Sequence, residues 1–331
     1  MTRRIGLFAL RLAVAVGGLT LVIRLAIPGA GEGLLTRLRS AWVAEPIETW
    51  SGILVATALF GVSYAIGAMR FRLLLASAGL PARFGSLLRA YLIASFFNLV
   101  LPGLIMGDVY RLADARRDTG RGAAVLGIVV LERLLGFAAL GAMALLAAPL
   151  LPGETALWVR LTVGLLGAAT LLGPFVPSST AGRRVATTLA NALSRVWPRA
   201  GDTAVSALEA IGRAALQPAV LARAFGLSLA NQWLPVFAVV ALASPLDTNI
   251  AVYWYAVIIP FVTLASLLPI SIGGTGVREA LFVGLFGAVG MRPEVALVLA
   301  LSTLFVALAW GLVGLLLFTL GRRHPGIAAT V

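Results

Sequence analysis

Apolar runs long enough to cross a bilayer recur from one end of this chain to the other. A helix needs roughly 20 residues to span the hydrocarbon core. The runs fall at about 5–27, 50–69, 84–101, 123–149, 156–176, 219–243, 251–268, 279–290 and 294–320. Only 12% of the 331 residues are charged, about half the share of a soluble domain. The sequence therefore predicts an all-α fold. We expect one polytopic transmembrane helix bundle over 1–331, with about eight apolar segments and no separate soluble domain.

Two of these segments, 84–101 and 279–290, are short for a crossing, and the first contains Arg89. We expect them to be re-entrant or broken helices. If 84–101 crossed fully, the loop around Arg117 would lie outside, although arginines favour the cytoplasmic face. If it enters and returns, that loop joins the arginines of 70–83 inside. If 279–290 crosses, both termini are then predicted to be cytoplasmic. The membrane is predicted to be a bacterial inner membrane.

The formal net charge is +13, and all 26 basic residues are arginines. In a membrane protein, arginines orient the chain and attract acidic headgroups. We therefore expect membrane lipids, anionic or phosphate-bearing, as partners, and no nucleic acid. A membrane protein partner is also conceivable, but the sequence does not identify one.

The one long polar stretch, 177–218, mixes arginines with small and apolar residues. This pattern suits an amphipathic helix on the cytoplasmic surface. A solvated connector is the alternative interpretation.

The chain has no cysteine, and its one histidine is His324. Thiolate chemistry and cysteine-based metal sites are therefore excluded. Histidine catalysis is not expected either. No metal and no cofactor is predicted.

An internal repeat is the most informative motif. Pro102 to Arg111 and Pro269 to Arg278 both follow the pattern Pro-x4-Gly-x3-Arg, and each lies between two apolar segments. Proline stops a helix, and glycine permits close backbone approach. The start of the next helix favours an anion, and arginine adds a fork that matches phosphate. Two such breaks in corresponding halves indicate a binding site at the repeat interface. The repeats could be inverted or parallel.

Charged residues also occur inside the apolar segment 123–149, where Glu132 and Arg133 are adjacent. Such charges usually face a bundle interior or a cavity. Neighbours in sequence do not share a helix face, so each should have a partner elsewhere. Glu132 could pair with Arg111 or Arg278. Further countercharges are Asp108 and Glu279.

A second polar group in an apolar segment is Asn231 with Gln232. These side chains could line a polar cavity, or they could hydrogen-bond between helices.

Three ordered motifs resemble the lysylphosphatidylglycerol synthase transmembrane family. They are Asn98-x3-Pro102-x4-Gly107-Asp108-x2-Arg111, Glu132-Arg133-x2-Gly136 and Pro269-x-Ser271-x-Gly273-Gly274-x-Gly276-x-Arg278-Glu279. The sequence departs from the family at 104–106, where many members carry small or polar residues. The candidate substrate-binding residues are Asn98, Pro102, Gly107, Asp108, Arg111, Glu132, Arg133, Pro269, Ser271, Gly273, Gly274, Gly276, Arg278 and Glu279.

The resemblance covers roughly 50–320 and implies the flippase portion of the larger family members. Such small members are suspected to move phospholipids or polyprenyl-phosphate-linked sugars. A synthase domain is not expected here, so aminoacyl transfer is not predicted. In this interpretation Arg111 and Arg278 hold the phosphate, and Glu132 balances charge.

Two other functions are open. A membrane enzyme such as a glycosyl transferase acting on a polyprenyl phosphate would need acidic side chains, and the nearest set is Asp108, Asp114 and Asp118. A non-transporting accessory subunit would need only a docking surface, for which 177–218 is the candidate. The leading expectation is a lipid transporter that is not an enzyme.

Overall fold

The computed structural model describes residues 46–101, 106–147, 198–246, 248, 250–266 and 275–321, with scattered residues between 149 and 188. The predicted segment 5–27 lies outside this part, and 156–176 lies largely outside it. Both Pro102 and Pro269, which open the two motifs, are also outside the described residues.

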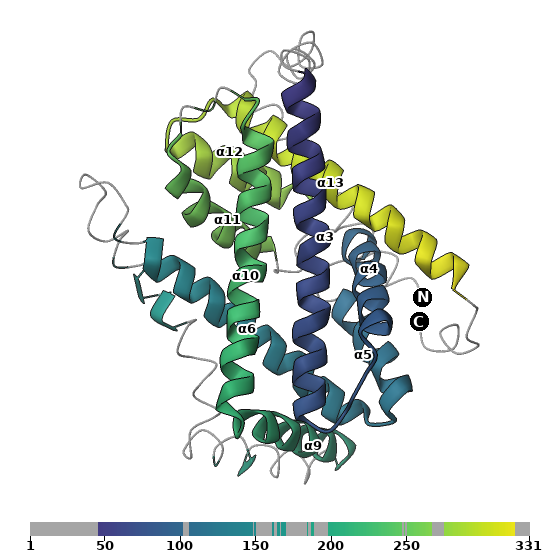
Figure 1. The fold of residues 1–331 in the computed structure, drawn as a ribbon. Helices are drawn as coiled ribbons and strands as arrows, with labels where there is room; N and C mark the ends of the chain where they lie inside the picture. The colour runs from purple at the N-terminus through teal and green to yellow at the C-terminus, as the bar shows by residue number, and fades with distance from the viewer. Residues whose placement is uncertain are drawn as a thin grey trace, which may run out of the picture.

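The described secondary structure is helical (Figure 1). Its helices are α3 (Pro46–Ser77), α4 (Phe84–Val100), α5 (Met106–Thr119), α6 (Gly122–Ala147), α9 (Pro198–Ala215), α10 (Pro218–Ala243), α11 (Val252–Ser266), α12 (Val277–Ala288) and α13 (Pro293–Leu320). Within the described residues, α3, α6, α10 and α13 are long and apolar enough to cross a membrane, and α4 and α11 are shorter apolar helices. The predicted all-α transmembrane bundle is confirmed.

Helices α4 and α5 form an antiparallel hairpin. At its open end, the Ser86 hydroxyl donates to Asp118 Oδ2 at 3.1 Å. At its tip, the Gly107 N–H donates to Asn98 Oδ1 at 2.8 Å. The chain therefore returns to the end of the bundle from which α4 started, which is the geometry that a re-entrant segment requires.

Helices α11 and α12 make a second hairpin. The ring of Tyr255, near the start of α11, lies 5.2 Å from the ring of Phe286, near the end of α12. The short predicted segment 279–290 is thus one arm of a hairpin, and the apolar segment 251–268 is the other arm.

The two halves of the fold repeat one order, in which a long helix is followed by a hairpin and a second long helix. The leading helices, α3 and α10, pack together along their length in opposite directions (Figure 1). The Gln217 side chain, before α10, donates to the carbonyl of Ser77, the last residue of α3, at 3.0 Å. The halves are therefore inverted relative to each other, which answers the question that the sequence left open.

The hairpin of each half packs against a long helix of the other half. Helix α4 packs on α13, and α11 packs on α6. This exchange buries both hairpins at the interface between the repeats, where inverted-repeat transporters hold their substrates.

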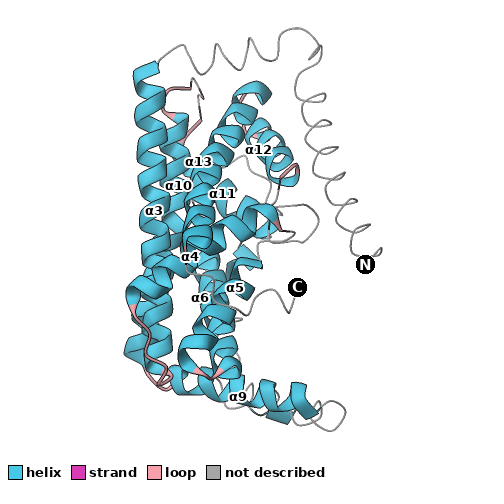
Figure 2. Ribbon diagram, turned by 90° about the vertical axis from the view of Figure 1, so that its right-hand side faces the viewer, coloured by secondary structure: helices cyan, strands magenta, loops and turns pink. Residues whose placement is uncertain are grey.

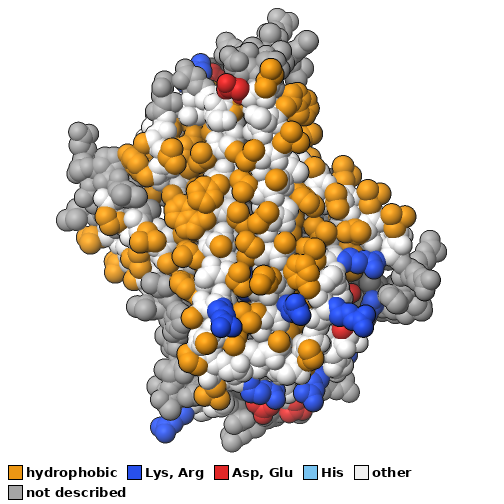
Figure 3. Space-filling model, in the orientation of Figure 1, with side chains coloured by type: hydrophobic (Ala, Val, Ile, Leu, Met, Phe, Trp, Pro, Cys, Tyr) orange, Lys and Arg blue, Asp and Glu red, His pale blue; other side chains and the backbone are white. Residues whose placement is uncertain are grey.

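The surface separates into an apolar belt and an arginine-rich end. Figure 3 shows hydrophobic side chains over the middle and basic side chains gathered toward the lower end. Exposed arginines of that end come from α3, α4, α5, α10 and the loops beside them: Arg72, Arg83, Arg89, Arg116, Arg117, Arg121 and Arg223. One-sided arginines are typical of a cytoplasmic face.

Helix α9 crosses this arginine-rich end and forms the described part of the 177–218 stretch (Figure 1). It buries Ala210 and Ala214 while Glu209 and Arg213 are exposed, so it is amphipathic. Its buried face packs against α6, whose Gly127 approaches the backbone of Ala207. The connector thus contains a helix packed on protein, and its position on a membrane surface stays a prediction.

Candidate functional site

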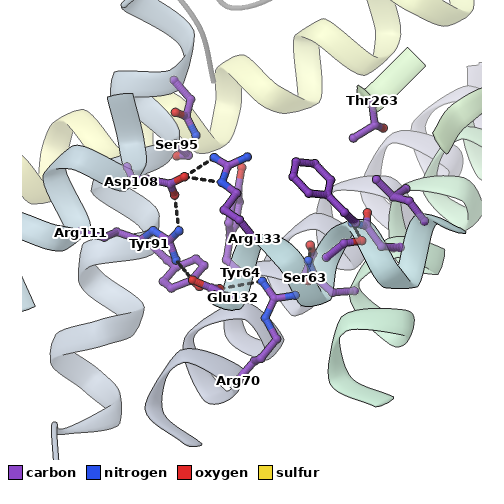
Figure 4. A pocket seen from close by; sticks show the side chains of 17 residues that line it. Ser63, Tyr64, Arg70, Tyr91, Ser95, Asp108, Arg111, Glu132, Arg133 and Thr263 are labelled. Carbon is purple, nitrogen blue, oxygen red and sulfur yellow. Dashed lines mark hydrogen bonds and ion pairs between the residues drawn. The ribbon is translucent and has the colours of Figure 1, made fainter. Parts of the chain in front are cut away.

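A cavity of about 240 Å³ lies where the two halves meet. Its lining comes from both repeats, because α3, α4, α5 and α6 of the first half are joined by α10 and α11 of the second. The polar and charged side chains that line it are Ser63, Tyr64, Arg70, Tyr91, Ser95, Asn98, Asp108, Arg111, Glu132, Arg133, Asn231, Gln232 and Thr263 (Figure 4).

Glu132 is the centre of the charged wall and is only 1% exposed. Its Oε1 accepts hydrogen bonds from Arg70 Nη2 at 2.6 Å and from the Tyr91 hydroxyl. Its Oε2 accepts from Arg111 Nη1 at 2.9 Å. A buried carboxylate needs such partners, since an unpaired charge is costly to desolvate.

Asp108 is the second carboxylate of this wall. It accepts from Arg111 Nη2 and from Arg133, which contacts it through both Nε and Nη2. The Arg111 guanidinium also lies over the Tyr91 ring, with 4.1 Å from Cζ to the ring centroid. Arg111 is therefore held on several sides by fixed partners.

The predicted charge pairs are settled by these contacts. Glu132 pairs with Arg111, and Asp108 supplies a countercharge, as expected. The alternative partner for Glu132 was wrong, because the Nη2 of Arg278 donates to its neighbour Glu279 at 2.7 Å. Glu132 and Arg133 do find different partners.

The described lining carries an excess of positive charge. Three arginines (Arg70, Arg111, Arg133) face two carboxylates (Asp108, Glu132), so the sum is +3 − 2 = +1. The undescribed parts of the two motifs, 102–105 and 267–274, contain no ionisable residue. In the part of the chain described, the buried Nε of Arg70 has no hydrogen-bond partner.

The opposite wall is polar and uncharged. The Ser63 hydroxyl donates to Asn231 Oδ1 at 2.9 Å, and Gln232 Nε2 donates to the Gly136 carbonyl at 3.4 Å. Both alternatives for Asn231 and Gln232 thus hold, since these residues line the cavity and also bond between helices.

The first motif shapes the hairpin tip. A Cβ on Gly107 would lie 2.7 Å from Asn98 Oδ1 and 2.8 Å from the Ala94 carbonyl oxygen. The glycine is therefore needed because α5 starts against α4. Asn98 caps that start by accepting the Gly107 N–H. We expected this glycine to bring backbone close to a ligand, but the structure shows that it brings two helices together.

The second motif forms a separate cluster at the start of α12. Gly276 has φ of +86°, a conformation that favours glycine, and its N–H donates to Glu279 Oε2 at 2.5 Å. Glu279 is fully buried, and its other oxygen accepts from Arg278. Gly276, Arg278 and Glu279 are not among the described residues that line the cavity. Pro269, Ser271, Gly273 and Gly274 lie outside the described residues.

Sequence reasoning missed Arg70 and Tyr91. Arg70 was grouped with the cytoplasmic loop because the apolar run stops at residue 69, whereas α3 continues to Ser77 and buries it. The spacing of polar residues could have indicated both. Arg70 follows Ser63 by seven residues, which is about two helical turns. Asn98 follows Tyr91 by the same distance. Each pair shares a helix face and lines the cavity.

A family comparison agrees with the motifs. The model described as lysylphosphatidylglycerol synthase TM region matches residues 8–316. The chain belongs to this family. No curated protein and no solved structure gives a match. Members of the lysylphosphatidylglycerol synthase TM region family are membrane proteins of lipid-related function, and the multi-pass fold of this chain agrees with that description.

The acidic set considered for an enzyme does not converge. Asp108 faces the cavity, while Asp118 accepts from Ser86 at the other end of α5. Within the described residues, no three histidine or carboxylate side chains are placed to hold a metal ion.

Proposed function

We propose that this chain transports a lipid, binding the headgroup of an anionic phospholipid or polyprenyl-phosphate-linked lipid in the cavity and moving it across the bilayer. The observation that supports this most is the excess positive charge at the interface of the inverted repeats. Positive charge inside an apolar bundle is stabilised by an anionic partner. A phosphate group supplies one, and arginine matches its geometry.

The arginines of the cavity take different roles in this proposal. Arg111 is 6% exposed and is committed to Glu132 and Asp108, so it positions the wall. The Arg133 side chain is 30% exposed, which leaves it accessible to a ligand. Arg70 adds a buried Nε donor that has no hydrogen-bond partner among the described residues. Arg133 and Arg70 are therefore the proposed phosphate contacts.

The second motif has a supporting role in this proposal. Arg278, Glu279 and Gly276 fix the start of α12, and so the shape of the hairpin that α11 and α12 form. The arginine-rich end is proposed to face the cytoplasm of a bacterial inner membrane.

A reconstitution assay tests the proposal. Purified protein in vesicles should translocate labelled phosphatidylglycerol or a labelled polyprenyl-phosphate sugar. Arg133→Gln should reduce the rate roughly tenfold or more, since a hydrogen bond to a charged group contributes about 1.5–3 kcal/mol and about 1.4 kcal/mol is tenfold.

Arg223→Gln is the matched control, because Arg223 is an exposed arginine of the same end. It should translocate like the wild type. If folded Arg133→Gln and Arg70→Gln both transport normally, or if the wild type transports neither lipid, the proposal is wrong.

A further inference from the structure

The two walls of the cavity differ in chemistry, and the difference restricts the headgroup. The wall from α5 and α6, together with Arg70, carries all five ionised side chains of the described lining. The neutral wall, from α3, α10 and α11, contributes Ser63, Asn231, Gln232 and Thr263, all of them polar and uncharged. A ligand that fills the space therefore meets charge on one side and hydrogen-bonding groups on the other.

The charged wall fits a single negative charge. Its sum is +1, and Arg70 is 8% exposed with an Nε donor that lacks a partner among the described residues. A phosphodiester carries one negative charge and accepts hydrogen bonds from arginine. A zwitterionic headgroup would leave the excess charge unbalanced.

An amine-bearing headgroup has no anionic partner here. Both oxygens of Glu132 accept from arginines, and so do both oxygens of Asp108. No other carboxylate is in the described lining. An ammonium group would enter a positively charged cavity and would lose its hydration without gaining a countercharge, which costs free energy.

The neutral wall fits hydroxyl groups. Ser63 uses the carbonyl oxygen of Asn231, so that contact leaves the amide N–H groups of Asn231 unused. Gln232 uses an amide N–H on Gly136, so that contact leaves its carbonyl oxygen unused. Both amides line the cavity. Together they offer a donor and an acceptor, and a hydroxyl group needs both.

We infer that the cavity selects a phosphodiester monoanion whose headgroup carries hydroxyls and no amine, such as a phosphoglycerol or phospho-sugar group. This inference rests on the proposed lipid function and narrows its substrate class. The volume of about 240 Å³ lies below the roughly 300–1,000 Å³ typical of drug-sized ligands. It suits a headgroup, with the acyl or prenyl chains left outside.

The test is a binding panel on the full chain in detergent, followed by native mass spectrometry. The lipids share their acyl chains and differ in headgroup: phosphatidylglycerol, phosphatidylmethanol, phosphatidylethanolamine and lysylphosphatidylglycerol. Phosphatidylglycerol should bind at least several-fold more tightly than each of the others. Phosphatidylmethanol is the sharpest comparison, because it keeps the charge and lacks the hydroxyls.

Two variants assign the selectivity to the two walls. Gln232→Leu should remove the preference for phosphatidylglycerol over phosphatidylmethanol and keep the preference over phosphatidylethanolamine. Arg70→Gln should weaken the discrimination against phosphatidylethanolamine. Thermal unfolding of each variant checks that it is folded. The binding panel on the wild type tests the headgroup selectivity even if neither variant folds.

Other outcomes are informative in defined ways. Equal binding of phosphatidylethanolamine or lysylphosphatidylglycerol by the wild type overturns the inference, even if vesicles show transport. Selective binding without transport overturns the proposed function and leaves the inference standing. Water-soluble glycerophosphoglycerol is the last probe. If it binds as tightly as phosphatidylglycerol, the site takes a soluble phosphodiester, and the lipid-transport proposal fails.

Discussion

At the scale of single residues, the site is a network in which each carboxylate holds two arginines. Glu132 joins Arg70 of α3 to Arg111 of α5, and Asp108 joins Arg111 to Arg133 of α6. Three helices are thereby tied together inside an apolar bundle. The same arginines that tie the helices together supply the excess positive charge of the described lining.

Glu132→Gln should be strongly destabilising. It removes the countercharge of Arg70 and Arg111, which are both buried, and breaking a buried ion pair costs about 3–5 kcal/mol. We expect a clear fall in the unfolding temperature of the purified protein. Glu209→Gln, at an exposed position of α9, is the control and should leave that temperature nearly unchanged. Equal stability of the two variants would contradict the network.

At the scale of elements, the two hairpins depend on their tips. Asn98 and Gly107 lock α4 to α5. In the second hairpin, Glu279 caps the start of its own helix by accepting the Gly276 N–H. The two Pro-x4-Gly-x3-Arg motifs thus occupy equivalent places and use different contacts. The repeat in sequence marks a repeat in fold, while the charge network is confined to the first half.

Gly107→Ala should weaken the first hairpin. Its methyl group would overlap Asn98 and the Ala94 carbonyl, and such overpacking costs about 1–3 kcal/mol. Gly284→Ala in α12 is the matched control, since a Cβ there meets nothing within 4 Å. Alanine favours a helix over glycine by about 0.5–1 kcal/mol. Unfolding temperatures should therefore fall for the first variant and stay or rise for the second.

At the scale of the whole molecule, inverted topology fixes which residues share a side of the membrane. Helix α3 and hairpin α4–α5 meet at the arginine-rich end, whereas α10 and hairpin α11–α12 meet at the opposite end. Helix α9 covers the arginine-rich end (Figure 2). If the chain transports lipid as proposed, we expect the halves to expose the cavity to either side by exchanging equivalent packings.

Cysteine labelling tests this topology cleanly, because the chain has no cysteine of its own. Arg83→Cys and Arg117→Cys, at the two ends of hairpin α4–α5, should react with an impermeant maleimide from the same side. Glu48→Cys, at the start of α3, should react from the other side. The hairpin interpretation is lost if positions 83 and 117 label from opposite sides.

Under the proposed transport function, we expect the packing between α4 and α13 to be the seam that opens. Among the described residues, α4 packs on α13 more extensively than its counterpart α11 packs on α6. Transport by inverted repeats requires the tighter pairing to loosen. Arg89→Cys with Leu317→Cys places thiols at this seam, where Arg89 Nη2 donates to the Leu317 carbonyl at 3.2 Å.

Joining these two thiols with a cleavable crosslinker should stop lipid translocation, and reduction should restore it. The two single-cysteine variants, treated with the same reagent, should keep their activity. Full transport by the crosslinked protein would exclude motion at this seam.

The class of fold, the repeat and several residues of the charged cluster could be predicted from the sequence. Hydrophobic length and arginine position are local properties, so they predicted the bundle and the returning segment at 84–101. Glu132 was expected to need an arginine partner because charges in apolar segments need partners, and Asp108 was named, beside Glu279, as a further countercharge.

Which charges pair with one another depends on how helices pack that lie far apart in the chain. The sequence therefore could not select Arg111 over Arg278 as the partner of Glu132, and it could not identify Arg70. The inverted relation of the halves likewise depends on how α3 and α10 pack. The apolar runs therefore predict that the chain lies in a membrane. The packing of its two hairpins between the halves brings three arginines and two carboxylates together in the described lining of one cavity.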